Sequence, residues 1–270
     1  MRGGFTVVIR AATTDDYRAF AALHGELGVV TPPPTRERFG ADLVPHTLIA
    51  ERDGRIAGYL HVQTLGTIGY VRQIAVAPFA RGDGLDRALM IAAARELRAG
   101  GVTTWHLDVS PVDRAAIALY ESLGLRVEHR STALRFPWER LLHVPGDAAT
   151  VLPVAAGEDD DIERALGLLS GQIAMARARR GHVLVQLRDA DCAAVGFAAF
   201  DPAFPGVRVF RVARPTLAAA LLGAIYPHAR DRALALVIDD DDATADLLVA
   251  HGAEVTLRLL HYTGALPVAA

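Results

Sequence analysis

Lysine and asparagine are both absent from the sequence, and cysteine occurs once, as Cys192. All 28 basic residues are therefore arginines, a bias that codon usage in a GC-rich genome would produce. A single cysteine excludes an intrachain disulfide and is typical of a reducing compartment. No apolar run reaches the roughly 18 to 20 residues of a membrane helix, and the opening stretch MRGGFTVVIRAATTDD lacks the apolar core of a signal peptide. These absences favour a cytoplasmic protein that does not enter a membrane.

A strong excess of charge is also missing. The 31 acidic and 28 basic residues leave a net charge of −3, so no nucleic-acid partner is expected. The ten histidines show no helical His-x-x-x-His spacing, and one cysteine cannot build a zinc site. The acidic run IDDDDATAD, residues 238–246, lacks the spaced ligands and the glycine of an EF-hand loop. We therefore expect no bound metal.

The chain has enough apolar residues, 51% of 270, to build two packed domains. Its first part is predicted to run strand, helix, three strands, helix, strand, helix and strand. Residues 144–160 mix proline, glycine and acidic residues, which is typical of a linker. We predict a first domain at residues 1–143 and a second at residues 161–270. The segments DRAAIALYESLGLRVEHR and DATADLLVAHGAEVTLRL share a helix, a glycine stop and a strand, which indicates an internal duplication.

One turn in the first domain is rich in glycine. Arg81-Gly82-Asp83-Gly84 lies between a strand-like run ending at Val76 and a predicted helix from Asp86 to Ala99. The unpaired N–H groups of a helix N-terminus attract anions, and glycines let a phosphate approach the backbone. The turn matches neither a Walker A loop nor a dinucleotide-binding fingerprint. Taken alone, the turn is a weak signal, and a tight turn that caps a helix is the simpler interpretation.

Two motifs together carry a family resemblance. Residues 76–78 and 81–85 read VAP and RGDGL, and LDVSPVDRAAIALYESLGL follows about 20 residues later. In this order they resemble the pyrophosphate loop and the later LEV…LYE.LGF motif of the GNAT superfamily of acyl-CoA-dependent N-acyltransferases. The C-terminal part is similar to the degenerate GNAT-like domain that follows such a domain in some bacterial proteins. The implied fold is α/β (α+β), with two tandem GNAT-like domains, each a mixed, mostly antiparallel central sheet flanked by helices.

The resemblance implies acetyl-CoA as co-substrate. Backbone amides of the glycine turn would hold the pyrophosphate, and the free edge of the preceding strand would pair with the pantetheine arm. The cofactor-binding residues implied in this way are Ile74, Ala75, Val76, Arg81, Gly82, Asp83, Gly84, Leu85, Asp86 and Asp113. By strand alternation, Tyr70, Arg72 and His106 share the cleft in which an amine would approach.

Two residues match the family's catalytic positions. Tyr120 matches the general acid, and a phenol of pKa near 10 suits a thiolate leaving group of pKa about 8.5; the alternative is a packing role against the sheet. Asp108 lies where the similar ribosomal-protein alanine acetyltransferases have a glutamate base. Being one methylene shorter, Asp108 would act through a water, or it is simply a solvated strand carboxylate. His106 is a further candidate for a base near neutral pH.

Two positions depart from the family pattern. Asp86 stands where the family has glycine or alanine, and Asp113 replaces an asparagine. A carboxylate stabilises a helix N-terminus but repels a pyrophosphate. Either Asp86 points away, held by Arg87 or Arg81, or the site has weakened or lost its cofactor.

The leading hypothesis is a bacterial-type N-acetyltransferase that acts on the primary amine of a small molecule or peptide. Its second domain would be a cofactor-free copy, and a homodimer would agree with the family's habit. The alternatives are a non-catalytic acyl-CoA-binding or structural tandem module, and a peptide-binding scaffold without any cofactor. Turnover of acetyl-CoA with a panel of amines discriminates between them.

Overall fold

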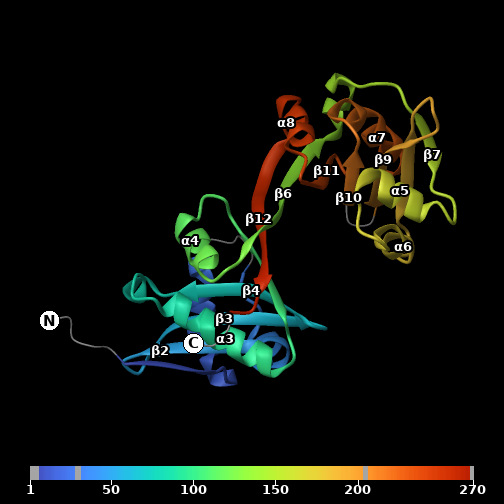
Figure 1. Cartoon of the computed structure of the whole chain (residues 1–270). Coiled ribbons are helices and arrows are strands. Elements are labelled where there is room, and N and C mark those ends of the chain that lie inside the picture. Colours follow the sequence, from blue (N-terminus) through green and yellow to red (C-terminus); the bar gives the residue numbers. More distant parts are fainter. Residues whose placement is uncertain (1–5, 28–31, 203–205, 268–270) are drawn as a thin grey trace. The chain divides into compact units, whose positions relative to one another are not determined.

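The computed structural model describes residues 6–27, 32–202 and 206–267 (Figure 1). The chain divides into two compact units. Unit 1 comprises Met1–Glu128 and Leu260–Ala270, and unit 2 comprises His129–Leu259. Among the described residues, no helix combines the length and apolarity needed to cross a membrane.

The division between the units differs from the one predicted from the sequence. The chain leaves unit 1 inside β6 (Arg126–Pro137) and returns to it inside β12 (Glu254–Ala265). Residues 144–160, predicted as a linker, instead contribute β7 (Thr150–Pro153), which pairs with β8 (Val183–Arg188) in unit 2. The sequence predicted strands at β6 and β12 but not their pairing partners, and it did not predict β7. Pairing decides to which unit a strand belongs.

The sheet of unit 1 has the strand order β1-β2-β3-β4-β5-β12, and only β4 and β5 run parallel. Its strands are β1 (Val7–Ala11), β2 (Thr47–Arg52), β3 (Arg55–Leu65), β4 (Ile68–Val76), β5 (Thr104–Val109) and the end of β12. Its helices are α1 (Tyr17–His24), α2 (Arg36–Arg38), α3 (Leu85–Ala99) and α4 (Arg114–Ser122).

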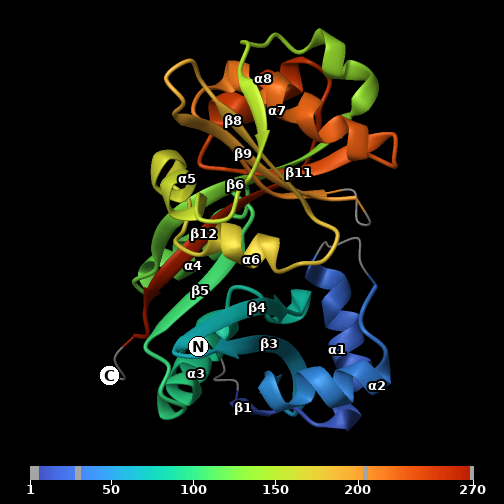
Figure 2. The same cartoon turned by 90° about the vertical axis from the view of Figure 1, so that its right-hand side faces the viewer.

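Two apolar cores cover the two faces of this sheet, because successive strand residues point to opposite faces. On one face Trp105 and Leu107 pack with α3 and α4. On the other, Tyr59 and Ala75 pack with Phe20 of α1. Figure 2 shows α1 and α2 on one side of β3 and α3 on the other.

The parallel strands β4 and β5 separate after four residue pairs. They pair from Ile68↔Thr104 to Val71↔Leu107 and no further. The separation begins at Arg72, which is an extra residue between the pairs Val62↔Val71 and His61↔Gln73 of β3 and β4. A bulge of this kind bends its strand and increases its twist. The last part of β4 therefore keeps one edge on β3 and has an open edge toward β5.

Unit 2 has the strand order β6-β11-β10-β9-β8-β7. Its further strands are β9 (Ala194–Asp201), β10 (Gly206–Val212) and β11 (Ala233–Asp239), and its helices are α5 (Asp159–Leu166), α6 (Gln172–Arg177), α7 (Ala218–Ile225) and α8 (Asp242–Ala250). Among the described residues, its parallel strands β10 and β11 pair at Gly206↔Ala235 and Val207↔Leu236 and at no further position. This repeats the separation of β4 and β5, as expected for the predicted duplication. Here, however, Pro215 begins a turn directly before α7, and no glycine loop precedes the helix.

Candidate active site

The glycine turn leaves a row of backbone amides available at the start of α3. Gly82 and Gly84 have φ of 82° and 78°, the left-handed region that favours glycine. The N–H groups of residues 82–86 donate no well-formed hydrogen bond to any described residue. A Cβ built on either glycine would meet no atom within 4 Å, so a ligand can approach the loop. The loop therefore has the geometry of an anion site.

Asp86 is held differently from either arginine pairing considered above. Its Oδ1 accepts a hydrogen bond of 2.8 Å from the backbone N–H of Arg87. The Arg87 guanidinium donates instead to Ser122 Oγ at 2.5 Å, and Arg81 donates to Glu26 at 2.8 Å. The Asp86 carboxylate therefore lies at the N-terminus of α3. It accepts the hydrogen bond of the Arg87 N–H, which is the amide directly after the unpaired N–H groups of residues 82–86.

The other two acidic residues near the predicted cofactor are engaged in the fold. Asp83 Oδ2 lies 2.5 Å from Nη1 of Arg52, which also donates to the carbonyl of Phe79 at 3.2 Å. Asp113 caps α4 by accepting from the N–H of Ala116 at 3.0 Å. Asp113 therefore supplies the capping oxygen that an asparagine would supply, and the charge of Asp83 is largely compensated.

The end of β4 offers the edge predicted for the pantetheine arm. Ile74, Ala75 and Val76 pair with β3 on one side, and no described residue of β5 pairs with them on the other. The carbonyl of Val76 accepts a hydrogen bond of 3.1 Å from Arg81 Nε. Arg81 therefore ties the glycine turn to the end of the open strand.

Beside that edge, the structure brings together the four predicted residues of the acceptor side. The Tyr70 hydroxyl donates to Asp108 Oδ2. The Tyr70 and His106 rings stack with centroids 6.4 Å apart and planes 12° apart. The Arg72 guanidinium lies 4.0 Å from the centre of the Tyr70 ring. These side chains line one face of β4 and β5, opposite the face that packs against α3 and α4.

Two histidine contacts on this face were not predicted from the sequence. His261 of β12 places Nδ1 2.5 Å from Asp108 Oδ1. His106 lies between Glu128, at 3.4 Å from Nδ1, and Thr263, at 3.3 Å from Nε2. His261 and Thr263 lay in the predicted second domain, and no sequence signal showed that β12 pairs with β5.

The proton in the Tyr70–Asp108 pair resides on the phenol. Burial by itself would raise the pKa of Asp108, but hydrogen bonds from His261 and Tyr70 outweigh it and hold that pKa below its ordinary value. Burial and the adjacent carboxylate raise the pKa of the Tyr70 phenol. Asp108 is therefore a carboxylate at neutral pH, and both of its oxygens already accept a hydrogen bond or ion pair.

Tyr120 lies on the opposite face of the sheet, on α4. Only 5% of the residue is exposed, and its ring centroid is 6.2 Å from that of Tyr262. Its hydroxyl donates no hydrogen bond to any described residue. Burial, with smaller contributions from Asp113 and Asp86, raises its pKa. The phenol is therefore protonated at neutral pH.

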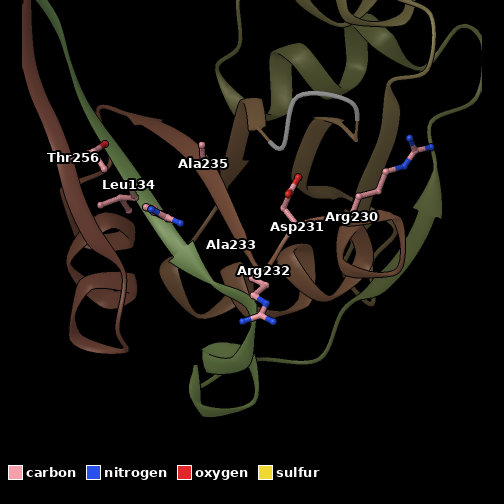
Figure 3. Close-up of a pocket in the computed structure, with 8 residues that line it drawn as sticks. Leu134, Arg230, Asp231, Arg232, Ala233, Ala235 and Thr256 are labelled. Carbon is pink, nitrogen blue, oxygen red and sulfur yellow. The ribbon is translucent and has the colours of Figure 1, made fainter. Parts of the chain in front are cut away.

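Within the described ranges, no three His, Cys, Asp or Glu side chains are arranged to hold a metal ion. A cavity of about 710 Å³ lies in unit 2, lined mainly by β6, β11 and the Arg230-Asp231-Arg232 segment (Figure 3). None of its lining residues belongs to the candidate site.

Comparison with known proteins finds similarity to acetyltransferases. Residues 13–125 match the model of the acetyltransferase (GNAT) family. A mycothiol acetyltransferase of Thermobispora bispora is 41% identical over 83 residues, which are 28% of this chain and 28% of that protein. The chain thus spans little more than a quarter of that relative's length.

Two solved structures resemble the chain over its whole length. A GCN5-related N-acetyltransferase from Sphaerobacter thermophilus is 17% identical with a TM-score of 0.60, covering 98% of this chain and 97% of that one. A tandem GNAT protein from the clavulanic acid biosynthesis pathway is 19% identical with a TM-score of 0.51, covering 99% and 100%. At these identities the likeness concerns the fold.

Proposed function

Because residues 13–125 of this chain match the GNAT family of acetyltransferases, we propose that unit 1 transfers an acetyl group from acetyl-CoA to a primary amine. The observation that carries the proposal is the separated β4–β5 pair. Beside this pair lie the unpaired amides of residues 82–86, the protonated phenol of Tyr120 on one face and the ionised cluster around Asp108 on the other. An acetyl donor and an amine can meet from opposite faces only where two neighbouring strands part.

The residues of unit 1 fit the cofactor. The open amides of residues 82–86 suit a pyrophosphate, and a Cβ would meet nothing at Gly82 or Gly84. The free edge at Ile74 and Val76 suits the amide-bearing pantetheine arm, which can pair as an added strand. When bound, acetyl-CoA supplies the thioester, and the protein supplies position and proton transfer.

Tyr120 is proposed as the general acid. As the amine nitrogen forms its bond to the acetyl carbon and the carbon–sulfur bond breaks, the phenol gives its proton to sulfur. Burial raises the pKa of Tyr120, and it would raise the pKa of a buried thiol in the same way. The pKa values of the phenol and the thiol therefore remain close to each other. The phenol stays protonated until the carbon–sulfur bond breaks and the sulfur takes up the proton.

Asp108 is proposed to take part in removing the proton from the acceptor ammonium. Its negative charge and that of Glu128 attract a cationic amine to the cleft lined by Tyr70, Arg72 and His106. Its lowered pKa, however, makes it a weak proton acceptor on its own. The acceptor is proposed to be the amine of a small molecule or of a peptide.

A second candidate function rests on Asp86. A carboxylate that occupies the Arg87 N–H competes with a phosphate for the same helix end. This contact favours a non-catalytic tandem module, structural or acyl-CoA-binding. For unit 2, which has no glycine loop before α7, we propose a cofactor-free role in either case.

One experiment separates these functions. The full chain is titrated with acetyl-CoA by calorimetry and then incubated with acetyl-CoA and a panel of amines, while free thiol is measured. Binding with amine-dependent thiol release supports the transferase, and binding without release supports a binding module. If the protein does not bind acetyl-CoA even at millimolar concentration, only the structural role remains.

A further inference from the structure

Two residues of opposite charge lie where β4 and β5 separate. The parallel register ends one residue before Arg72 on β4 and one residue before Asp108 on β5. The preceding residues on the same face, Tyr70 and His106, are still cross-strand partners. Because residues two apart on a strand point to the same face, Arg72 and Asp108 flank the first open position on the acceptor side.

These two charged residues do not form an ion pair with each other. The oxygens of Asp108 are engaged by the Tyr70 hydroxyl and by His261. Arg72 donates from Nε to Oε1 of Gln63 at 2.9 Å. Burial raises the pKa of Asp108, but hydrogen bonds from His261 and Tyr70 and, to a smaller extent, the charge of Arg72 lower it. Arg72 and Asp108 are therefore close enough to interact through space without touching.

The Arg72 guanidinium is fixed at one nitrogen and along its plane. Gln63, which accepts from Nε, lies opposite Tyr70 in the pairing of β3 with β4. The guanidinium carbon lies 4.0 Å from the centre of the Tyr70 ring, a cation–π contact. Nη1 and Nη2 donate to no described residue. A guanidinium held in this way presents the planar fork that binds a carboxylate through two parallel hydrogen bonds.

The position of this cation has a consequence for the acceptor. Arg72 is exposed and is the extra residue of the bulge in β4, and bulges change the direction of side chains. Like charges repel, so a cation at this position opposes an acceptor whose only charge is its ammonium group. An acceptor that also carries a negative group is attracted to the same position.

We infer that Arg72 determines acceptor specificity by binding a carboxylate, so that the acceptor is an amino acid or a similar small molecule with an amine and a carboxylate a few carbons apart. The inference rests on the proposed acetyl transfer. The carboxylate binds Nη1 and Nη2 of Arg72 on β4, and the negative charge of Asp108 on β5 attracts the ammonium. The acetyl group still goes to nitrogen, and the carboxylate takes no part in the reaction.

A carboxylate fits this position better than a phosphate. One guanidinium compensates the single charge of a carboxylate, and its two free nitrogens match the two carboxylate oxygens. A phosphate group carries about 1.5 to 2 negative charges at neutral pH. Beside Asp108, a phosphate would therefore leave an excess of negative charge.

The test compares each acceptor with its primary carboxamide, which has nearly the same shape but no negative charge. Glycine, β-alanine, 4-aminobutyrate and L-ornithine vary the distance between amine and carboxylate. The full chain is incubated with acetyl-CoA and each compound, and free thiol is measured. We expect at least one free acid to exceed its amide in kcat/KM by about 10- to 100-fold, as for one hydrogen bond between charged groups.

Variants assign this preference to Arg72. Because an amide also changes the basicity of the amine, the deciding quantity is the change in the acid-to-amide ratio between parent and variant. Arg72→Met keeps the length of the side chain without its charge, and should lower this ratio about 10- to 100-fold. Arg72→Lys keeps the charge but not the fork, and should restore part of the ratio. Arg95→Met is the control at an exposed arginine of α3, and should leave the ratio unchanged.

A second readout does not depend on turnover. With CoA in place of acetyl-CoA, calorimetry compares the Kd of the preferred acid with that of its amide. Arg72→Met should weaken binding of the acid about 10- to 100-fold more than binding of the amide.

An unchanged acid-to-amide ratio in Arg72→Met would overturn the carboxylate assignment while the transferase function stands. The same holds if O-phosphoethanolamine is preferred to every acid and Arg72→Met removes that preference, because Arg72 would then bind a phosphate. If no amine causes thiol release, both the transferase and the acceptor assignment are overturned.

Discussion

Tyr262 of β12 donates a hydrogen bond of 3.1 Å to the carboxylate of Glu121, the residue that follows Tyr120 on α4. The neighbouring residue on β12, His261, contacts Asp108 on the opposite face. Because successive strand residues alternate in direction, one strand contacts the helix of the proposed acid on one face and the carboxylate of Asp108 on the other. The candidate site of unit 1 therefore depends on residues from the end of the chain.

Tyr120→Phe should abolish most of the turnover and leave the fold and the acetyl-CoA affinity intact. Removal of a general acid typically costs about 10²- to 10⁴-fold in rate. Tyr262→Phe is the matched control, because it removes a nearby phenol that contacts Glu121 instead of the open site. Rates are measured as free thiol released, and affinities by calorimetry. Full activity in Tyr120→Phe would exclude the acid role and leave only packing.

Substitution of Asp86 should strengthen acetyl-CoA binding. Asp86→Asn keeps an oxygen for the Arg87 N–H but removes the charge, whereas Asp86→Ala removes both. We expect a gain of about 2- to 5-fold from Asn, since a charge at a helix terminus is worth roughly 0.3–1 kcal/mol, and a further gain from Ala if the freed amide binds phosphate. Calorimetry at low and high salt checks this, because salt screens the repulsion between the Asp86 carboxylate and the phosphates. The gain in affinity from Asn should therefore be smaller at high salt. Equal affinity in all three proteins would show that Asp86 does not oppose the cofactor.

Much of this site could be predicted from the sequence because its parts are local. The glycine turn, the α4 motif and the shared face of Tyr70 and Arg72 are properties of continuous segments. The contact of His261 with Asp108 could not be predicted, because it depends on the pairing of β12 with a strand about 150 residues earlier. The division of the chain into units differs from the predicted boundary for the same reason. The contact of Asp86 with its neighbour's N–H also depends on a rotamer that the sequence pattern does not specify.

Unit 1 should lose stability in acid through Asp16. This carboxylate is 6% exposed and accepts hydrogen bonds from Arg10 and from Thr13. The Arg10 hydrogen bond is the main reason why the pKa of Asp16 is lowered, against the opposing effect of burial. A group whose pKa is lower in the folded state stabilises the fold above its unfolded pKa of about 3.9. That stabilisation is lost as the pH falls from about 4 through the folded pKa.

The two tryptophans allow the stability of unit 1 to be measured separately. Trp105 is buried in unit 1 and Trp138 in unit 2. In a Trp138→Phe background, urea unfolding followed by fluorescence reports on Trp105. Asp16→Asn should lower the free energy of unfolding by about 1.5 to 3 kcal/mol at pH 7 and flatten its decline below pH 4. An unchanged decline in Asp16→Asn would assign the acid sensitivity to another carboxylate.

The same reporter tests whether β12 belongs to the core of unit 1. Tyr262 is 1% exposed and packs in the cluster that contains Trp105. Tyr262→Ala should lower the unfolding free energy reported by Trp105 by about 3 to 5 kcal/mol, as for other large aromatic truncations in a core. Tyr262→Phe should lower this free energy of unfolding by about 1 kcal/mol, because it removes the hydrogen bond to Glu121 while the ring stays in place.

Leu257→Ala is the control on the same strand. Leu257 is 49% exposed and lies in unit 2, so this change should leave the Trp105 transition within about 0.5 kcal/mol. If Tyr262→Ala behaves like Leu257→Ala, the last strand does not complete unit 1, and the placement of His261 beside Asp108 fails with it.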